Sequence, residues 1–178
     1  LGNRSILADA RRDDMKDVVN HAVKLREGFR PFAPACLAEH VNEWFDMKGL
    51  KDSPYMLFVV PVQEDKRTKI PAVTHVDGSA RVQTVTAEQN PRFHKLLQAF
   101  HKRTGVPVFM NTSFNVKGEP IVNTPADAIR CFLNTQIDML VLDDVIVEKR
   151  PEVAEALAKE RAKDKARTGR VVNGQVSL

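Results

Sequence analysis

The stretch NTSFNVKGEP at residues 111–120 directly follows the apolar run VPVFM at residues 106–110, and together they indicate the fold. The apolar run has the length and composition of a buried strand, and short amide and hydroxyl side chains begin where it stops. In open α/β sheets, ligands bind outside the carboxyl ends of strands. Residues 111–120 are therefore a candidate phosphate or nucleotide loop. An ordinary polar turn is the alternative, since loops are polar by default.

Helix and strand patterns alternate on both sides of this stretch. Asp13 or Asp14 is positioned to cap a helix, Asn90 and Pro91 begin another that Gly105 ends, and further helices are expected near residues 38–45 and from 125. The expected strands lie at residues 56–62, 73–76, 81–85, 106–110, 139–142 and 145–147. The alternation predicts an α/β class with a twisted, mixed parallel and antiparallel sheet flanked by helices.

Three predictions concern how these elements connect. The turn at Asp77-Gly78 predicts a hairpin between residues 73–76 and 81–85. A strand, a helix and a strand in succession from residue 106 to 142 predict a parallel pair with a right-handed crossover. Residues 145–147 either extend the sheet edge or pair antiparallel with it. We expect one domain at residues 1–150, followed at 151–178 by a charged helix and a flexible end.

Composition sets broad limits on function. The 178 residues suffice for one well-cored domain, and 43% hydrophobic with 28% charged residues is ordinary for a globular protein. No apolar stretch approaches the roughly 20 residues that span a bilayer, and no signal peptide is visible. Cys36 and Cys131 lack metal-type spacing and are expected to be reduced core residues of a cytoplasmic protein. A net charge of +4 permits an anionic ligand.

Basic side chains are concentrated in one proline-stiffened loop. Lys24, Arg26 and Arg30 lie within seven residues, and the arginine fork and the lysine point charge both suit phosphate recognition. A solvated basic turn is the alternative. Arg81 follows the Asp77-Gly78 turn, where it either reaches an anion from a sheet face or points to water.

Other candidate chemistry is sparse. A lone His75 on a strand is more often a hydrogen-bonded partner than a catalyst, and no second His, Cys or carboxylate stands at metal spacing. P-loop, GxGxxG and GxSxG motifs are absent. Glu119 either binds a magnesium ion or an amine, or only caps Asn115.

Several separate segments carry a family resemblance. LGNRSILAD at residues 1–9, RPFAP at 30–34, HVDGSARVQ at 75–83 and NTSFN at 111–115 resemble, in this order, the O-carbamoyltransferases that modify nodulation factors and antibiotics. The similarity covers roughly residues 1–149. It implies a carboxyl-terminal, YrdC-like domain that forms carbamoyl-adenylate from ATP and carbamoyl phosphate, with magnesium carried by the nucleotide. A separate amino-terminal domain, actin-like and metal-bearing, then transfers the carbamoyl group to a hydroxyl.

The resemblance also implies roles for particular residues. Lys24 and Arg30 would hold the phosphate of carbamoyl phosphate, whereas Arg81, Asn111 and Ser113 would contact the nucleotide phosphates or the adenylate. The family places a further Arg shortly before the LGNRS motif, upstream of Leu1. The chain also begins without Met, so we expect it to be part of a longer protein whose transferase domain is its partner.

The residue types suit this chemistry better than hydrolysis. Adenylation aligns an acyl oxygen with the α-phosphate while charge builds on the departing pyrophosphate, and cations stabilise that charge without a protein nucleophile. A double-stranded RNA-binding module of the same fold is the alternative, based on charge and fold analogy. Nothing in the sequence identifies the carbamoyl acceptor.

Overall fold

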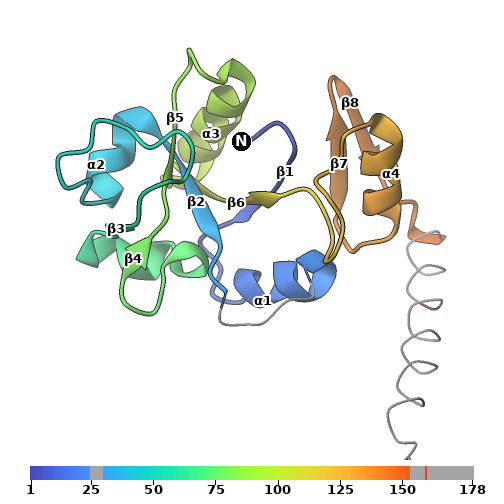
Figure 1. Cartoon of the computed structure of the whole chain (residues 1–178), viewed down its shortest axis with the longest axis horizontal. Coiled ribbons are helices and arrows are strands. Elements are labelled where there is room, and N and C mark those ends of the chain that lie inside the picture. Colours follow the sequence, from blue (N-terminus) through green and yellow to red (C-terminus); the bar gives the residue numbers. More distant parts are fainter. Residues whose placement is uncertain (25–29, 153–158, 160–178) are drawn as a thin grey trace, which may run out of the picture. The chain divides into compact units, whose positions relative to one another are not determined.

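The structure is a computed structural model that describes residues 1–24, 30–152 and 159. The chain divides into two compact units, Leu1–Val122 and Asn123–Leu178, and each is described by itself (Figure 1). Arg26 and nearly all of the helix and flexible end predicted at 151–178 lie outside the described residues. The domain boundary at residue 150 stays a prediction.

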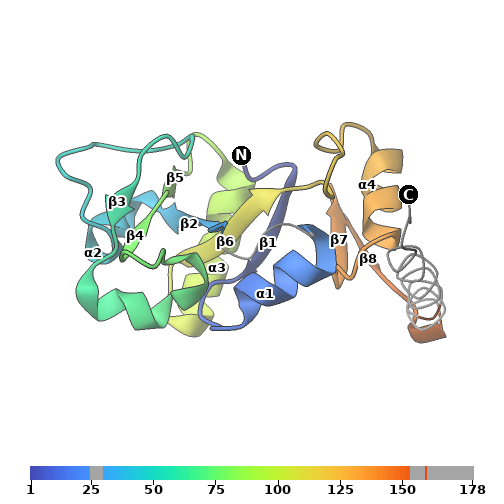
Figure 2. The same cartoon turned by 60° about the horizontal axis from the view of Figure 1, so that its bottom comes forward.

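A four-stranded mixed sheet forms the centre of the first unit. Its strands are β1 (Ser5–Asp9), β2 (Ala33–Leu37), β5 (Gln83–Val85) and β6 (Val108–Ser113), in the order β1-β6-β2-β5. β6 runs antiparallel to both β1 and β2, while β2 and β5 are parallel (Figure 2). The predicted α/β class with a mixed sheet and flanking helices is thereby confirmed.

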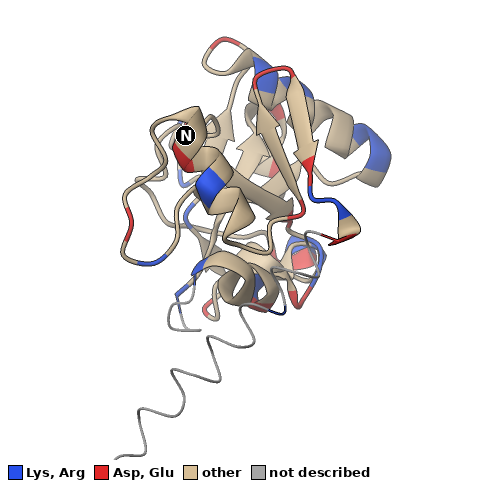
Figure 3. Ribbon diagram, turned by 90° about the vertical axis from the view of Figure 1, so that its right-hand side faces the viewer, with Lys and Arg blue, Asp and Glu red and all other residues tan. Residues whose placement is uncertain are grey.

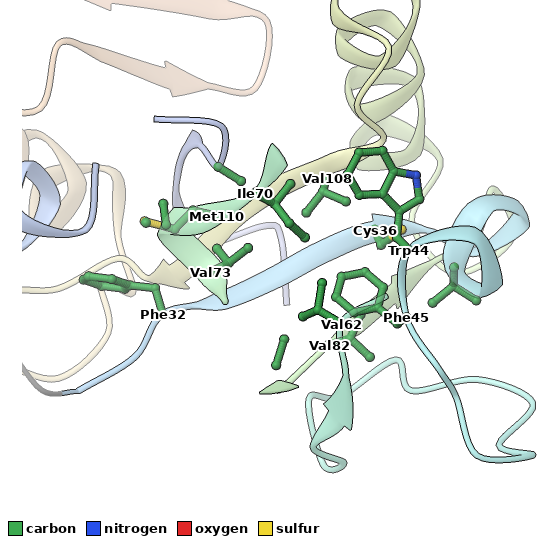
Figure 4. Packing of buried hydrophobic residues seen from close by; sticks show 14 of the residues in the cluster. Phe32, Cys36, Trp44, Phe45, Val62, Ile70, Val73, Val82, Val108 and Met110 are labelled. Carbon is green, nitrogen blue, oxygen red and sulfur yellow. The ribbon is translucent and has the colours of Figure 1, made fainter. Parts of the chain in front are cut away.

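The two faces of this sheet pack against different elements. Ala35 and Leu37 of β2 join Phe93 and Leu97 of α3 (Pro91–Thr104) on one face. Because side chains alternate along a strand, Cys36 points to the opposite face. There it joins the larger apolar cluster shown in Figure 4, whose labelled members are Phe32, Cys36, Trp44, Phe45, Val62, Ile70, Val73, Val82, Val108 and Met110. β2 is consequently buried along its whole length.

Short elements surround the sheet. They are α1 (Met15–Val19) with a π-helical turn at Asn20–Lys24, a 3-10 turn at Ala38–His40, α2 (Val41–Trp44), β3 (Val60–Pro61), 3-10 turns at Glu64–Lys69 and Pro71–Val73, and β4 (Ser79–Ala80). β3 and β4 form a separate antiparallel pair. The helices expected near residues 15 and 38–45 are confirmed.

Sharp local signals make α3 the best-predicted element. The Asn90 side chain accepts from the Phe93 N–H at 3.2 Å, and Pro91 occupies the first turn. Gly105 follows the last turn with φ of 74°, a left-handed conformation that glycine adopts without a Cβ clash. The predicted beginning and end of this helix are confirmed.

Two strand predictions in the first unit are wrong. Only Val60–Pro61 of the predicted strand 56–62 is a strand; Leu57, Phe58 and Val59 are exposed, at 71%, 42% and 58%. The hairpin predicted around Asp77-Gly78 does not form either. The turn is present, because the Gly78 N–H donates to the His75 carbonyl at 2.9 Å, but the chain before it is a 3-10 turn. The strands after it pair with other partners: β4 with β3, and β5 with β2.

The second unit contains α4 (Pro125–Leu133), β7 (Met139–Leu142) and β8 (Val145–Glu148). β7 pairs antiparallel with β8 across a tight connection, as one of the two options for residues 145–147 predicts. The predicted parallel pair between residues 106–110 and 139–142 is wrong, because β6 has β1 and β2 as neighbours. Ile129 of α4 is 41% exposed.

Among the described residues, no helix combines the length and the apolar character needed to cross a bilayer. Both cysteines are buried and no disulfide joins them, as predicted for reduced core residues.

Candidate functional site

A cavity of about 480 Å³ lies at the carboxyl end of β6. Its wall combines residues 3–5 at the start of β1, residues 31–33 leading into β2, and residues 111–113 ending β6, with Arg81 between β4 and β5. The four segments are far apart in sequence, and the antiparallel pairing of β6 with β1 and β2 brings three of them together. The sequence placed residues 111–113 in a loop, but they are the last three residues of β6.

Three of the predicted site residues line this cavity: Arg81, Asn111 and Ser113. Arg81 is exposed, so its guanidinium is available to a ligand entering from solvent. Arg4 supplies a second guanidinium, and no Asp or Glu is among the lining residues that the structure describes. The wall therefore offers positive charge and neutral hydrogen-bonding groups, which suits an anion.

The predicted Lys24 reaches the site through Ser113. Its side chain is 5% exposed, and its ammonium donates to the Ser113 carbonyl at 2.6 Å and lies 3.1 Å from the Ser113 hydroxyl. It also contacts Asn115 through the side-chain oxygen at 2.8 Å and the carbonyl at 3.1 Å. A lysine is almost never buried unless it is paired, and these oxygens provide the pairing.

Asn111 is oriented by a buried neighbour. Its side-chain NH2 donates to the Gln83 side-chain oxygen at 2.7 Å, and both residues are below 5% exposed. Asn111 and Gln83 lie on the same face of the sheet as Ala35 and Leu37, which pack against α3. Gln83 was not among the predicted site residues, although it belongs to the HVDGSARVQ segment.

Arg30, the remaining predicted site residue, is exposed and directly precedes the lining segment 31–33 without itself lining the cavity. The structure therefore brings Lys24, Arg81, Asn111 and Ser113 to one site and places Arg30 at its edge. The roles assigned to these residues stay predictions.

His75 belongs to a small hydrogen-bonded chain outside the cavity wall. Its Nδ1 lies 2.9 Å from the Ser79 hydroxyl, which donates to Asp77 at 2.7 Å. Because that hydroxyl proton goes to Asp77, the His75 Nδ1–H is the donor to Ser79. Burial lowers the pKa of His75, opposed by the nearby Asp77. The contact with Ser79 agrees with the prediction of a hydrogen-bonded His75. Among the described residues its Nε2 has no partner.

Sequence reasoning missed Arg4, Met56 and Ile121 on the wall. The LGNRS motif contains Arg4, but nothing in the motif distinguished it from a solvated arginine; in the structure it donates to the Val122 carbonyl at 3.2 Å. Met56 has φ of 57°, a left-handed conformation that no strand pattern predicts.

The comparisons with known proteins agree over most of the chain. The family model described as Carbamoyltransferase C-terminus matches residues 1–149. The nodulation protein NolNO of Sinorhizobium fredii is 52% identical over 151 residues, which are 84% of this chain and 22% of that protein. A 3'-hydroxymethylcephem-O-carbamoyltransferase of Streptomyces clavuligerus is 42% identical over 144 residues, 81% of this chain and 27% of that enzyme.

Nodulation protein U of Rhizobium tropici is 47% identical over 118 residues, which are 66% of this chain and 20% of that protein. The chain thus spans 20 to 27% of the length of these three relatives. The family match covers all the segments that carried the resemblance. This chain belongs to the carbamoyltransferase C-terminus family.

Proposed function

We propose that this chain is the part of a carbamoyltransferase that binds ATP and carbamoyl phosphate and forms carbamoyl-adenylate. The observation that carries the proposal is the cavity at the carboxyl end of β6, whose described wall has two arginines and no carboxylate. Its volume of about 480 Å³ falls in the range of small-molecule sites, roughly 300–1,000 Å³. A nucleotide and a carbamoyl group carry the phosphate and amide chemistry that such a wall recognises.

The reaction needs positioning and charge stabilisation. Carbamoyl phosphate, ATP and water give carbamoyl-adenylate, pyrophosphate and inorganic phosphate. Water first cleaves the bond between the carbamoyl group and the phosphate, which gives carbamate and inorganic phosphate. In the adenylation step a carbamate oxygen forms a bond to the α-phosphorus of ATP, and the bond from that phosphorus to the departing pyrophosphate breaks. Arg81 and Lys24 would stabilise the charge that develops, and Asn111 would orient the acyl group or the phosphate. Magnesium would arrive with the nucleotide and neutralise part of its phosphate charge.

Transfer of the carbamoyl group would be the task of the rest of a longer protein. The cephem relative is named for O-carbamoylation of a hydroxymethyl group, and this chain matches 27% of its length. We therefore propose an amino-terminal transferase domain as the partner that receives the adenylate. The acceptor would be recognised there.

The roles within the site can be separated by substitution. Arg30→Ala is expected to weaken the binding of carbamoyl phosphate far more than the binding of ATP. The loss of one charge-assisted contact costs on the order of 1.5–3 kcal/mol, which is about one to two decades of affinity. Ser113→Ala is expected to weaken the binding of ATP instead. The loss should be smaller than in Arg30→Ala, since a neutral hydroxyl contributes less to binding than a charged group. Titrations of both ligands on both variants measure this. Equal losses throughout would mean one undivided anion site.

The chemical proposal is tested by product formation. The chain is incubated with Mg²⁺-ATP, with and without carbamoyl phosphate, and pyrophosphate is measured. Release that depends on carbamoyl phosphate and disappears in Arg81→Ala supports adenylate formation. The proposal would be contradicted if the folded chain binds both ligands but releases no pyrophosphate, and if the full-length protein releases none either.

Binding of double-stranded RNA remains the alternative of a different class. Figure 3 shows Lys and Arg interleaved with Asp and Glu along the described ribbon. An RNA surface would instead gather cations on one face or helix. Affinity for RNA that falls steeply with salt and is unchanged by Lys24 and Arg30 substitutions would favour this alternative.

A further inference from the structure

In the loop that follows β6, the side-chain amide of Asn115 makes four hydrogen bonds, two at its oxygen and two at its nitrogen. Asn115 accepts at its side-chain oxygen from the Lys24 ammonium at 2.8 Å and from the Ser113 hydroxyl at 2.6 Å. Its side-chain NH2 donates to the Glu119 carbonyl at 2.8 Å and to the Val116 carbonyl at 3.3 Å. One side chain thus links two predicted ligand residues to the backbone of the loop.

The orientation of this amide is fixed by the chemistry of its neighbours. Turning it over would set the NH2 group against an ammonium and the oxygen against two carbonyls, so three of the four contacts would become repulsive. The loop keeps the carbonyls in place with a turn in which the Glu119 N–H donates to the Val116 carbonyl at 3.3 Å. Gly118 has φ of 82° in that turn, which glycine adopts readily.

We propose that Asn115 is the positioning residue of the site: its oxygen sets where the Lys24 ammonium and the Ser113 hydroxyl lie. Neither Asn115 nor Lys24 is among the residues lining the cavity, whereas Ser113 is. Asn115 therefore acts on a ligand through Ser113 on the wall and through the charge of Lys24, which contacts Ser113 from behind it. A lysine on a flexible four-carbon stem gains most from such an anchor, because its position is otherwise spread over many rotamers. This inference rests on the proposed function only for the identity of the ligands.

One arm of the test needs no ligand. NMR of the lysine ammonium groups reports whether the Lys24 ammonium protons are held in hydrogen bonds and exchange slowly. We expect a protected Lys24 ammonium in the parent chain and faster exchange in Asn115→Ala, where the Ser113 carbonyl and hydroxyl and the Asn115 carbonyl remain as acceptors. No change is expected in Asn42→Ala, the same substitution at an exposed position on α2. An unchanged Lys24 signal in folded Asn115→Ala would overturn the inference, whatever the protein binds.

The second arm is a double-mutant cycle on carbamoyl phosphate affinity. Asn115→Ala alone is expected to weaken binding about tenfold or more, the effect of misplacing one charge-assisted contact. In a Lys24→Ala background the same change is expected to weaken it by less than about twofold, because the group it positions is gone. Circular dichroism and thermal unfolding confirm that each variant is folded. Equal losses in both backgrounds would assign Asn115 a purely structural role.

The two arms separate the possible failures. If the parent chain binds neither ligand while the ammonium result is as expected, the proposed function fails and the positioning of Lys24 by Asn115 stands. If the parent binds both ligands and the cycle is additive, the positioning role fails and the proposed function stands. Asn115→Ser, which keeps a small oxygen acceptor, is expected to restore part of the affinity lost in Asn115→Ala.

Discussion

Single amides and hydroxyls, together with their partners, define the site at the residue scale. Asn111 and Gln83 are buried in the sheet, and each satisfies the other through one hydrogen bond. Ser113 and Lys24 are likewise in direct contact. Asn111 and Ser113 on the cavity wall therefore each have a neighbour that fixes their position, which is the arrangement that precise binding requires.

We expect Gln83→Ala to destabilise the protein and weaken its ligand site. The change leaves the Asn111 NH2 group without its partner in a buried place, which costs about 1–3 kcal/mol. Urea unfolding measures the loss in the free energy of unfolding. Gln89→Ala, at an exposed position, is the matched control and is expected to change it by less than about 0.5 kcal/mol. Equal stability of the two variants would show that the amide pair contributes nothing.

The sequence predicted part of the site in two ways. The end of an apolar run indicated residues 111–120 as a candidate loop, and the family resemblance implied ligand contacts for Arg81, Asn111 and Ser113, which line the cavity. Gln83 and Asn115 were missed as positioning residues. Their importance comes from hydrogen bonds across 28 and 91 residues of sequence, which no local pattern contains.

At the scale of elements, α4 shows how local signals begin a helix. The Thr124 hydroxyl accepts from the Asp127 N–H at 3.1 Å, and the Asp127 carboxylate accepts from the Thr124 N–H at 3.0 Å. This reciprocal capping box satisfies donors that the first turn would otherwise leave free. Hydrogen bonding with Thr124, through its side chain and then its backbone, lowers the pKa of Asp127 to about 2.

Thr124→Ala is expected to weaken α4 by about 1 kcal/mol, the usual cost of losing a cap side chain. Hydrogen exchange of the α4 amides measures the change locally. Thr124→Ser, which keeps the hydroxyl, is expected to retain most of the protection. Protection in Thr124→Ala equal to that of the parent chain would contradict the capping role.

The same cap predicts a pH dependence. Because the pKa of Asp127 is lower in the folded helix than its ordinary value of 3.8, its contribution is present above about pH 4 and is lost as the pH falls toward 2. Protection factors of the α4 amides are expected to fall over this range in the parent chain. Asp127→Asn should remove that part of the fall, and Asp138→Asn, outside α4, should leave it in place. A fall of the same size in Asp127→Asn would exclude the carboxylate as its source.

Elements with their own start and stop signals were predicted well, and pairing was not. Asn90 and Gly105 mark the ends of α3 by chemistry that is local to the helix. The apolar run before Val60 looked like a buried strand, yet residues 57–59 are exposed and unpaired in the described chain. The sequence predicted a parallel pair between residues 106–110 and 139–142, whereas β6 pairs with β1 and β2. Sequence order does not show that β1, at the start of the chain, lies beside β6.

At the scale of the whole molecule, the sheet of the first unit serves as a frame for the site. β6 is central, with antiparallel neighbours on both sides, so its last three residues are held by β1 on one side and lie next to the start of β2 on the other. The apolar clusters on the two faces keep this strand in register. A site on such a frame is expected to be largely formed before a ligand arrives.

The frame itself can be weakened without touching the cavity. Met110→Ala removes a fully buried side chain from β6, which is expected to lower the free energy of unfolding by about 2–5 kcal/mol. Because the lining residues 111–113 follow it in the same strand, ligand affinity should fall as stability does. Leu96→Ala, at a position 48% exposed on α3, is the control and should have a much smaller effect. Equal losses in the two variants would show that β6 is not the centre of the packing.

The central claim is that the cavity at the carboxyl end of β6 binds both Mg²⁺-ATP and carbamoyl phosphate. Isothermal titration calorimetry of each ligand into the parent chain, Arg81→Ala and Arg103→Ala tests it most directly. Arg103 is an exposed arginine on α3 and controls for loss of one positive charge. We predict binding of both ligands to the parent, about tenfold or greater weakening of ATP in Arg81→Ala and none in Arg103→Ala. A folded parent chain that binds neither ligand, or equal weakening in the two variants, would contradict the claim.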